Sequence, residues 1–252
     1  MSSAELLYGN RAANTLGAAA PALNLAARDE IVLKQVEIHY CLFELPMASV
    51  LPRLPTSLHP SIPAVLGITV WRCVDGPLGA FSLAYIGLAC RTGIKPRHFI
   101  HGAFCDSPQV GTWLGDRYGL DCQAARIHNL ETYDRIHSRV DLNGKTILDL
   151  VTHGAQPLVG RGAMVKYSPL LNAAALGMES ALVQMETSFE FHRVSRGQPT
   201  AGVYNAAALG DATLAPRYPI SGTFSVVDVT LHPARFKLDL AVPAEQGGAR
   251  KI

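Results

Sequence analysis

The sequence predicts an α+β protein that is mainly antiparallel β, with a closed or nearly closed sheet and a few short peripheral helices. Three observations predict this fold. Apolar and polar residues alternate over many short segments after Asp29, as they do in strands that bury one face. The pair Asn143-Gly144 supplies the positive φ angles that a two-residue hairpin turn needs. Helical patterns are confined to a few short stretches.

The predicted elements follow one another without an internal repeat or a linker. Strands are expected over 31–45, 64–74, 81–91, 97–106, 181–194, 201–207 and 222–240, and a long hairpin over 131–154. Short helices are expected over 47–60, 107–119 and 168–178. Ser107 and Pro108 suit the start of the second helix, and Gly119 suits its end. We therefore predict one domain over 31–252, preceded by an Ala-rich, partly ordered arm over 1–30.

Composition restricts the class of protein. The chain has 252 residues, of which 48% are apolar and 17% charged, enough for one substantial core. The net charge is +2 and the basic residues are scattered, which argues against a nucleic-acid partner. No apolar stretch approaches the roughly 20 residues that span a membrane, and the N-terminal stretch lacks the pattern of a signal peptide. The five cysteines show no disulfide pattern, so we expect a cytoplasmic protein without a membrane partner.

One stretch, "RHFIHGAFCD", contains metal-ligand residue types: His98, His101, Cys105 and Asp106. In a strand, however, His98 and His101 point to opposite faces, and His101 lies roughly 13 Å from Cys105 along the strand. No G-x-S-x-G or other nucleophile motif occurs in the sequence. We expect no metal and no cofactor.

The order of several weak motifs resembles the acetoacetate decarboxylase superfamily. The motifs are "LPRLP", "GPLGAF", "FCDSP", "GTWLGDRYG", the long hairpin and "LAPRYPISGTF", and together they cover about Ile31 to Leu240. The resemblance implies a cone-shaped, mainly antiparallel β-barrel with peripheral short helices. It also implies a homo-oligomer whose pocket binds a small oxo acid or related carbonyl compound.

The resemblance further implies a reactive lysine, which this chain lacks. Decarboxylases of that superfamily carry a Pro-Lys-Lys stretch after a Gly-Arg-Glu helix, and one lysine forms a Schiff base with the substrate. Here "GDRYG" is followed by "LDCQAAR", so Gln123 or Ala124 falls at the position of the lysine. The pocket arginine and the two pocket carboxylates of the superfamily fall near Val36, Ile68 and Leu83, all apolar. We therefore expect no Schiff-base chemistry.

Two classes of function remain. The first is an enzyme of the lyase, hydratase or isomerase type that uses the pocket without an imine. The second is a non-catalytic binding protein for a small hydrophobic acid or ketone; a decarboxylase with an unrecognised lysine is a further alternative. For the enzyme, we assign catalysis to Arg117, His101 and Gln123, and substrate binding to Asp116, Tyr118 and Trp71.

These assignments rest on residue chemistry and on position near the motif helix. Arg117 suits bidentate binding of a carboxylate, His101 suits proton transfer near neutral pH, and Gln123 suits donation to an oxyanion. Structural alternatives are a solvated Arg117–Asp116 pair, a core histidine at 101, and a glutamine at 123 that bonds to the backbone.

Overall fold

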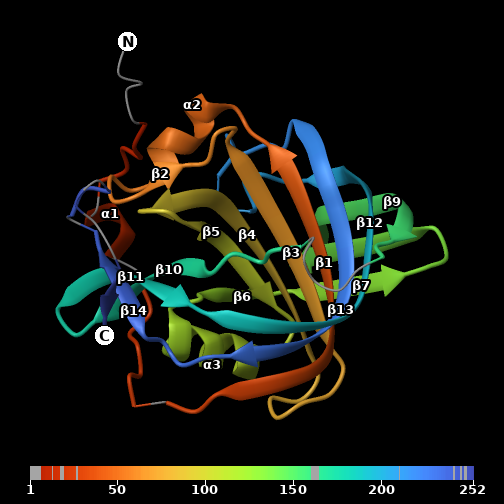
Figure 1. The fold of residues 1–252 in the computed structure, drawn as a ribbon, viewed down its shortest axis with the longest axis horizontal. Helices are drawn as coiled ribbons and strands as arrows, with labels where there is room; N and C mark the ends of the chain where they lie inside the picture. Colours follow the sequence, from red (N-terminus) through yellow and green to blue (C-terminus); the bar gives the residue numbers. More distant parts are fainter. Residues whose placement is uncertain are drawn as a thin grey trace.

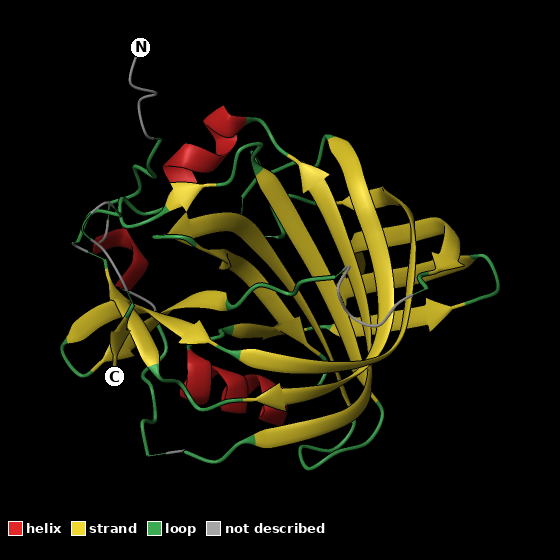
Figure 2. Ribbon diagram, in the orientation of Figure 1, coloured by secondary structure: helices red, strands yellow, loops and turns green. Residues whose placement is uncertain are grey.

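The computed structural model describes residues 7–12, 14–17, 20–26, 28–159, 165–209, 211–240, 242–244, 246 and 249–252. Within these ranges the chain forms one 15-stranded sheet and a few short helices (Figures 1 and 2). The prediction of a mainly antiparallel β-fold with short helices is therefore confirmed. None of the helices in the described ranges is both long enough and apolar enough to cross a membrane.

The bounds of the elements are as follows. The helices are α1 (Asn14–Gly17), α2 (Met47–Val50), the 3-10 helix η1 (Leu51–Arg53) and α3 (Pro108–Tyr118). The strands are β1 (Ile31–Glu44), β2 (His59–Pro60), β3 (Val65–Cys73), β4 (Phe81–Thr92), β5 (Lys95–Cys105), β6 (Cys122–Ala124), β7 (Arg126–Glu131), β8 (Arg135–Leu142), β9 (Lys145–Pro157), β10 (Leu170–Leu176), β11 (Glu179–Met185), β12 (Thr187–Tyr204), β13 (Tyr218–Leu231), β14 (Phe236–Asp239) and β15 (Arg250–Lys251).

The sheet order is β15-β14-β11-β10-β5-β4-β3-β1-β13-β12-β9-β8-β7, with β2 beside β4 and β6 beside β5. The long strands β1, β3, β4 and β13 lie side by side in its centre (Figure 1). The sheet curls so that β7, at one end of this order, packs against β3 and β4. Two ladders are parallel, both of them on β5, where β10 and β6 pair with different parts of the same edge.

Alternation along the strands buries two cores on opposite faces of the sheet. Core A contains Ile68 and Phe99, and core B contains Val36, Trp71 and Leu83. The helix α3 packs on the face of core B, where Leu114 and Tyr118 join it. Val36 and Leu83 thus belong to one packed cluster, whereas Ile68 lies on the other face.

Local signals predicted the turns of the fold well. The β8–β9 hairpin turns at Asn143 and Gly144, with φ angles of 51° and 75°, as expected. Ser107 caps α3 by accepting a hydrogen bond from the Val110 N–H, and α3 ends at Gly119 with φ 70°. Glycine is required there, because a Cβ atom would lie 2.7 Å from the Cβ of Ala174 on β10.

Five predicted elements were wrong in type or in bounds. The helix predicted over 47–60 ends at Arg53, and 59–60 form β2; the strand predicted over 201–207 ends at Tyr204. The stretch 168–178, predicted as a helix, contains β10, because pairing with β11 and β5 outweighs the helix propensity of its alanines. The predicted strand 181–194 is divided at Glu186 between β11 and β12. The predicted strand 222–240 is likewise divided into β13 and β14.

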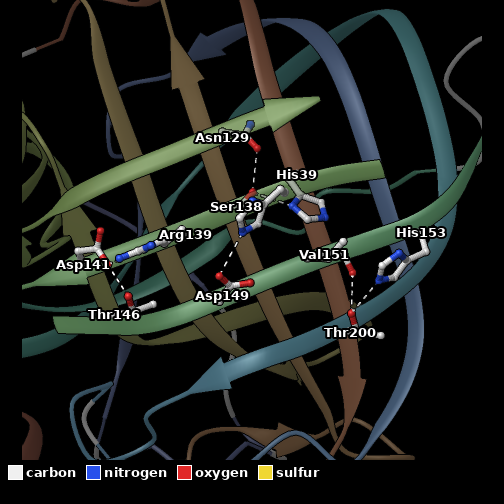
Figure 3. A network of polar contacts seen from close by, with 11 residues as sticks. His39, Asn129, Ser138, Arg139, Asp141, Thr146, Asp149, Val151, His153 and Thr200 are labelled. Atoms are coloured by element: carbon white, nitrogen blue, oxygen red, sulfur yellow. Dashed lines mark hydrogen bonds and ion pairs between the residues drawn. The ribbon is translucent and has the colours of Figure 1, made fainter. Parts of the chain in front are cut away.

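A polar network lies buried beside core A, between β1 and the β7–β8–β9 strands (Figure 3). His39 Nδ1 lies 2.7 Å from Ser138 Oγ, and Ser138 donates to Asn129 Oδ1 at 2.8 Å. His39 Nε2 lies 2.8 Å from Thr152 Oγ1. Because Ser138 donates to Asn129, it accepts from His39, which fixes a neutral imidazole with its proton on Nδ1. Burial, together with the charge of His137, lowers the pKa of His39 to about 3.

This burial makes stability depend on pH. Burial also lowers the pKa of His98 to about 4, so both histidines stay neutral in the fold at a pH where the unfolded chain, with a pKa near 6.5, binds protons. The free energy of unfolding therefore decreases as the pH falls from about 6.5 towards 4, by up to about 1.4 kcal/mol per pH unit for each histidine.

We expect His39→Gln to remove about half of this pH dependence of the free energy of unfolding, measured by urea unfolding across that range. His153→Gln, at an exposed site on β9, should leave the slope intact. An identical slope in the His39 and His153 variants would contradict the account.

Candidate functional site

The edge of β5 is interrupted between its two parallel partners. Strand β10 pairs with β5 at His98 and Phe99, and β6 pairs with it from Ala103 to Cys105. On the other edge, β5 has a bulge against β4 between Gly102 and Ile100, so His101 is the extra residue. The sheet thus has a gap beside 100–102, and a bulge at the same place turns the backbone.

A groove of about 420 Å³, here called the β5 groove, opens at this gap. Its walls come from four segments: the N-terminal arm, β5, the turn from α3 into β6, and β10. The polar side chains that line it are those of Arg11, Thr15, His101, Asp121, Gln123 and Asn172. Two of the three residues predicted to be catalytic, His101 and Gln123, therefore lie in one groove.

Arg11 brings a cation to the groove from the N-terminal arm. The arm is held in place by backbone hydrogen bonds from Gly9 to Leu58 and from Arg11 to Leu54. Arg11 Nε donates to Thr15 Oγ1 at 3.3 Å, and no carboxylate of the described residues pairs with the guanidinium. Partial burial, and then the charge of Arg53, lower the pKa of Arg11. An anionic ligand would relieve both effects, so Arg11 is suited to bind a carboxylate.

Asn172 supplies an unsatisfied buried acceptor on the β10 side. Only 2% of the residue is exposed, and its Nδ2 donates to the Tyr118 carbonyl at 3.0 Å. Its Oδ1 has no hydrogen-bond partner among the residues that the structure describes. An unpaired buried amide oxygen costs stability unless a ligand or water donates to it. Gln123, on β6, is exposed and faces the same groove.

Arg117 and Tyr118 lie apart from this groove. Arg117 is 6% exposed, its guanidinium carbon lies 5.1 Å from the Trp113 ring centre, and its Nε donates to the Tyr118 hydroxyl at 3.1 Å. That hydroxyl in turn donates to the His232 carbonyl at 2.8 Å. One guanidinium nitrogen, Nη2, is buried without a hydrogen-bond partner in the described ranges. Arg117 is thus not the solvated half of a pair with Asp116, and its predicted contact with substrate stays a prediction.

The other predicted binding residues are dispersed. Asp116 is exposed in a second groove of about 320 Å³ between α3 and β6, which adjoins the β5 groove at Asp121. Trp71 is 2% exposed and packs edge-on against Tyr85 and Phe189 in core B. The structure therefore brings together His101 and Gln123, and places Asp116, Tyr118 and Trp71 elsewhere.

Two residues of the groove were missed from the sequence. Arg11 lies in an arm without a recognisable element, and nothing in the sequence links the arm to β5. Asn172 offered a usable signal, because it is the polar residue in the apolar stretch "LLNAAAL". Within the described ranges, no three His, Cys, Asp or Glu side chains gather closely enough to hold a metal ion.

Comparisons with known proteins identify the fold. No protein-family model and no curated protein match the sequence. Among solved structures, an acetoacetate decarboxylase is similar with a TM-score of 0.74 and 9% identity, over 89% of this chain and 91% of that one. The acetoacetate decarboxylase from Legionella pneumophila is similar with a TM-score of 0.72 and 14% identity, over 93% of this chain and 97% of that one. The enduracididine biosynthesis enzyme MppR complexed with pyruvate is similar with a TM-score of 0.68 and 18% identity, over 83% of this chain and 90% of that one. The predicted acetoacetate decarboxylase-type fold is therefore confirmed.

The burial of Arg117 predicts a structural contribution that can be measured. Replacing it with alanine removes two cation–π contacts and the hydrogen bond to Tyr118. We expect Arg117→Ala to lower the free energy of unfolding by about 2–4 kcal/mol in urea titration. The matched control is Arg126→Ala at an exposed site on β7, which should change stability by less than about 0.5 kcal/mol. Equal free energies of unfolding for the two variants would show that Arg117 does not contribute to core packing.

Proposed function

We propose that this protein is an enzyme that transfers a proton on a small oxo acid or related carbonyl compound bound in the β5 groove, without forming an imine. The observation that carries the proposal is the convergence of a cation, an imidazole and two amides on one groove. The fold is consistent with it, because the structures that it resembles include acetoacetate decarboxylases and a complex with pyruvate. A lyase, hydratase or isomerase reaction fits this set of groups.

Each group has a role that its chemistry supports. Arg11 binds the carboxylate of the substrate. The Gln123 amide donates to the carbonyl oxygen and stabilises the negative charge that develops there. His101 removes a proton from the carbon beside the carbonyl and returns it to a neighbouring position. Asn172 Oδ1 accepts a hydrogen bond from a hydroxyl group of an enol or hydrate.

The distribution of lysines argues against an imine. None of the six lysines is buried, and none lines the β5 groove; they are Lys34, Lys95, Lys145, Lys166, Lys237 and Lys251. Lys34 lines a different cleft, but its ammonium contacts Asp228 at 2.6 Å, and this hydrogen bond raises its pKa. A nucleophilic lysine needs the opposite shift, towards the neutral amine. Lys34 is therefore a poor candidate for the unrecognised lysine of a decarboxylase.

The predicted site residues that do not line the β5 groove have other proposed roles. Asp116, in the adjoining groove, is placed to contact a longer substrate that extends past Asp121. Arg117, Tyr118 and Trp71 would act indirectly, by supporting α3 and core B. The proposed partner is the small carbonyl or carboxylate ligand, in a homo-oligomer.

Proton transfer at carbon is testable with pyruvate as the probe. In D₂O, we expect the wild-type protein to exchange the methyl protons of pyruvate for deuterium, followed by NMR. His101→Gln should slow this exchange by about 100-fold or more, because it removes the base. Arg11→Leu should raise the pyruvate concentration at half-saturation rather than abolish exchange. The control is His128→Gln, at an exposed site on β7, which should exchange like the wild type. Saturable binding without any exchange would favour the binding-protein alternative.

The absence of an imine is testable by trapping. Borohydride added to the protein with acetoacetate or pyruvate should leave its intact mass unchanged, because no neutral lysine reaches the ligand. Acetoacetate decarboxylase is the positive control under the same conditions. A stoichiometric mass increase that maps to any lysine of this chain would overturn this part of the proposal.

A further inference from the structure

A second cleft, larger than the β5 groove, lies where β1, β12 and the β3–β4 turn meet. It has a volume of about 710 Å³ and is here called the bulge cleft. One part of its lining is apolar, formed by Val32, Val74, Pro77 and Val226. Val32 and Val74 are 41% and 56% exposed, although both are large aliphatic residues. No residue is shared with the lining of the β5 groove, so the two sites are separate.

Two β-bulges build the polar part of the cleft. β1 and β12 flank β13, and each has a bulge: β1 between Leu33 and Val36, and β12 at His192. Gln35 in the first bulge has φ 52°, a conformation that residues other than glycine rarely adopt. Asn143, the other such residue in the described chain, lies in a hairpin turn. A conformation of this kind within a strand persists only where its surroundings hold it.

Asp228 of β13 holds both bulges. It accepts hydrogen bonds from the Gln35 backbone N–H at 2.9 Å, from Lys34 Nζ at 2.6 Å and from His192 Nε2 at 3.0 Å. Burial by itself would raise the pKa of Asp228, but these three donors hold it well below its ordinary value. The carboxylate is therefore ionised and fully occupied. His192 in turn donates from Nε2, so the neutral form of its imidazole carries the lone pair on Nδ1.

The groups left for a ligand have opposite character. Lys34 has two remaining N–H groups and is 66% exposed, so it presents a positive charge to the cleft. Asp75 presents a carboxylate: its Oδ1 accepts a hydrogen bond from the Gly76 N–H, and its Oδ2 accepts none from the described part of the chain. His192 Nδ1 is a further acceptor. Glu37 and Arg193 also line the cleft, but each is engaged in a two-point ion pair, with Arg72 and Glu131 respectively.

We propose that the bulge cleft binds an α-amino acid with an apolar side chain, as the zwitterion. Lys34 binds the α-carboxylate, and Asp75 and His192 Nδ1 accept from the α-ammonium. The side chain lies against Val32 and Val74, which removes their exposed surface from water. The match of one cation, two acceptors and an aliphatic wall favours the zwitterion over a fatty acid or a simple amine, since a fatty acid makes no contact with the acceptors and an amine makes none with Lys34.

Binding of L-leucine, compared with two analogues that each lack one charge, tests the proposal. Isothermal titration should show L-leucine binding to the wild-type protein, and 4-methylpentanoate and 3-methylbutylamine binding at least about tenfold more weakly. Lys34→Gln and Asp75→Asn, both at exposed sites, should each lower the affinity for L-leucine by about tenfold. Lys145→Gln, in the exposed hairpin turn, is the matched control and should bind like the wild type. His101→Gln, in the other groove, should also leave L-leucine binding unchanged.

Three outcomes would overturn the proposal. The first is no binding of L-leucine up to about 20 mM. The second is equal affinity for 4-methylpentanoate, which would show that the ammonium is not recognised. The third is unchanged L-leucine affinity in both Lys34→Gln and Asp75→Asn. Each variant is checked by its urea unfolding curve, so a loss of binding from unfolding is separable from a loss of contact.

Discussion

The candidate site depends on one constraint of the sheet: β5 shares a single edge between two parallel partners. β10 takes the part near His98 and β6 takes the part from Ala103, so neither covers the residues between them. How closely the two partners approach is fixed by Gly119, whose missing side chain lets the α3–β6 turn lie against β10. A side chain at this position would collide with Ala174 and also meets a positive φ. The glycine of "GDRYG" therefore sets the geometry of the groove, which it also lines.

The structure separates buried polar groups that stabilise the fold from partly exposed groups that suit chemistry. The His39 network has residue types seen in hydrolases. Ser138 lies beside the imidazole (Figure 3), and Cys41 Sγ lies 3.1 Å from His39 Nε2. Its members are buried, however, and burial raises the pKa of the Cys41 thiol to about 12. A neutral thiol and an imidazole with a pKa near 3 are poor nucleophile and base at neutral pH. In the β5 groove, by contrast, His101 is half-buried and Gln123 is exposed, and both line the space that a ligand would occupy.

Much of the fold could be predicted from local signals, and much of the site could not. The Asn143-Gly144 hairpin and the limits of α3 follow from backbone preferences of a few adjacent residues. The order of motifs identified the fold, although single motifs were weak and the identities to similar structures are below 20%. The parallel pairing of β10 with β5 was not visible, because such a pairing joins residues far apart in sequence. The stretch around Asn172 consequently looked like a helix, and its place in the groove was lost with it.

The same limitation explains the mixed result for the predicted site residues. His101 and Gln123 lie on adjacent strands of one parallel ladder, so a prediction from position near the motif helix brought both to the groove. Arg117 follows the same reasoning but faces Trp113 and Tyr118 instead, because the face that a helical residue presents depends on packing. Arg11 supplies the cation that Arg117 was expected to supply. The arm that carries it is joined to η1 by backbone hydrogen bonds that no sequence pattern indicates.

The central claim is that a small oxo acid binds where the edge of β5 is interrupted. Amide chemical-shift mapping of the isotope-labelled protein with pyruvate tests this claim most directly. The account predicts that the largest saturable shifts fall on 100–102, on Gln123 and on Asn172, with little change in core B. Shifts centred instead on Val36, Trp71 and Leu83, with the edge of β5 unaffected, would contradict it.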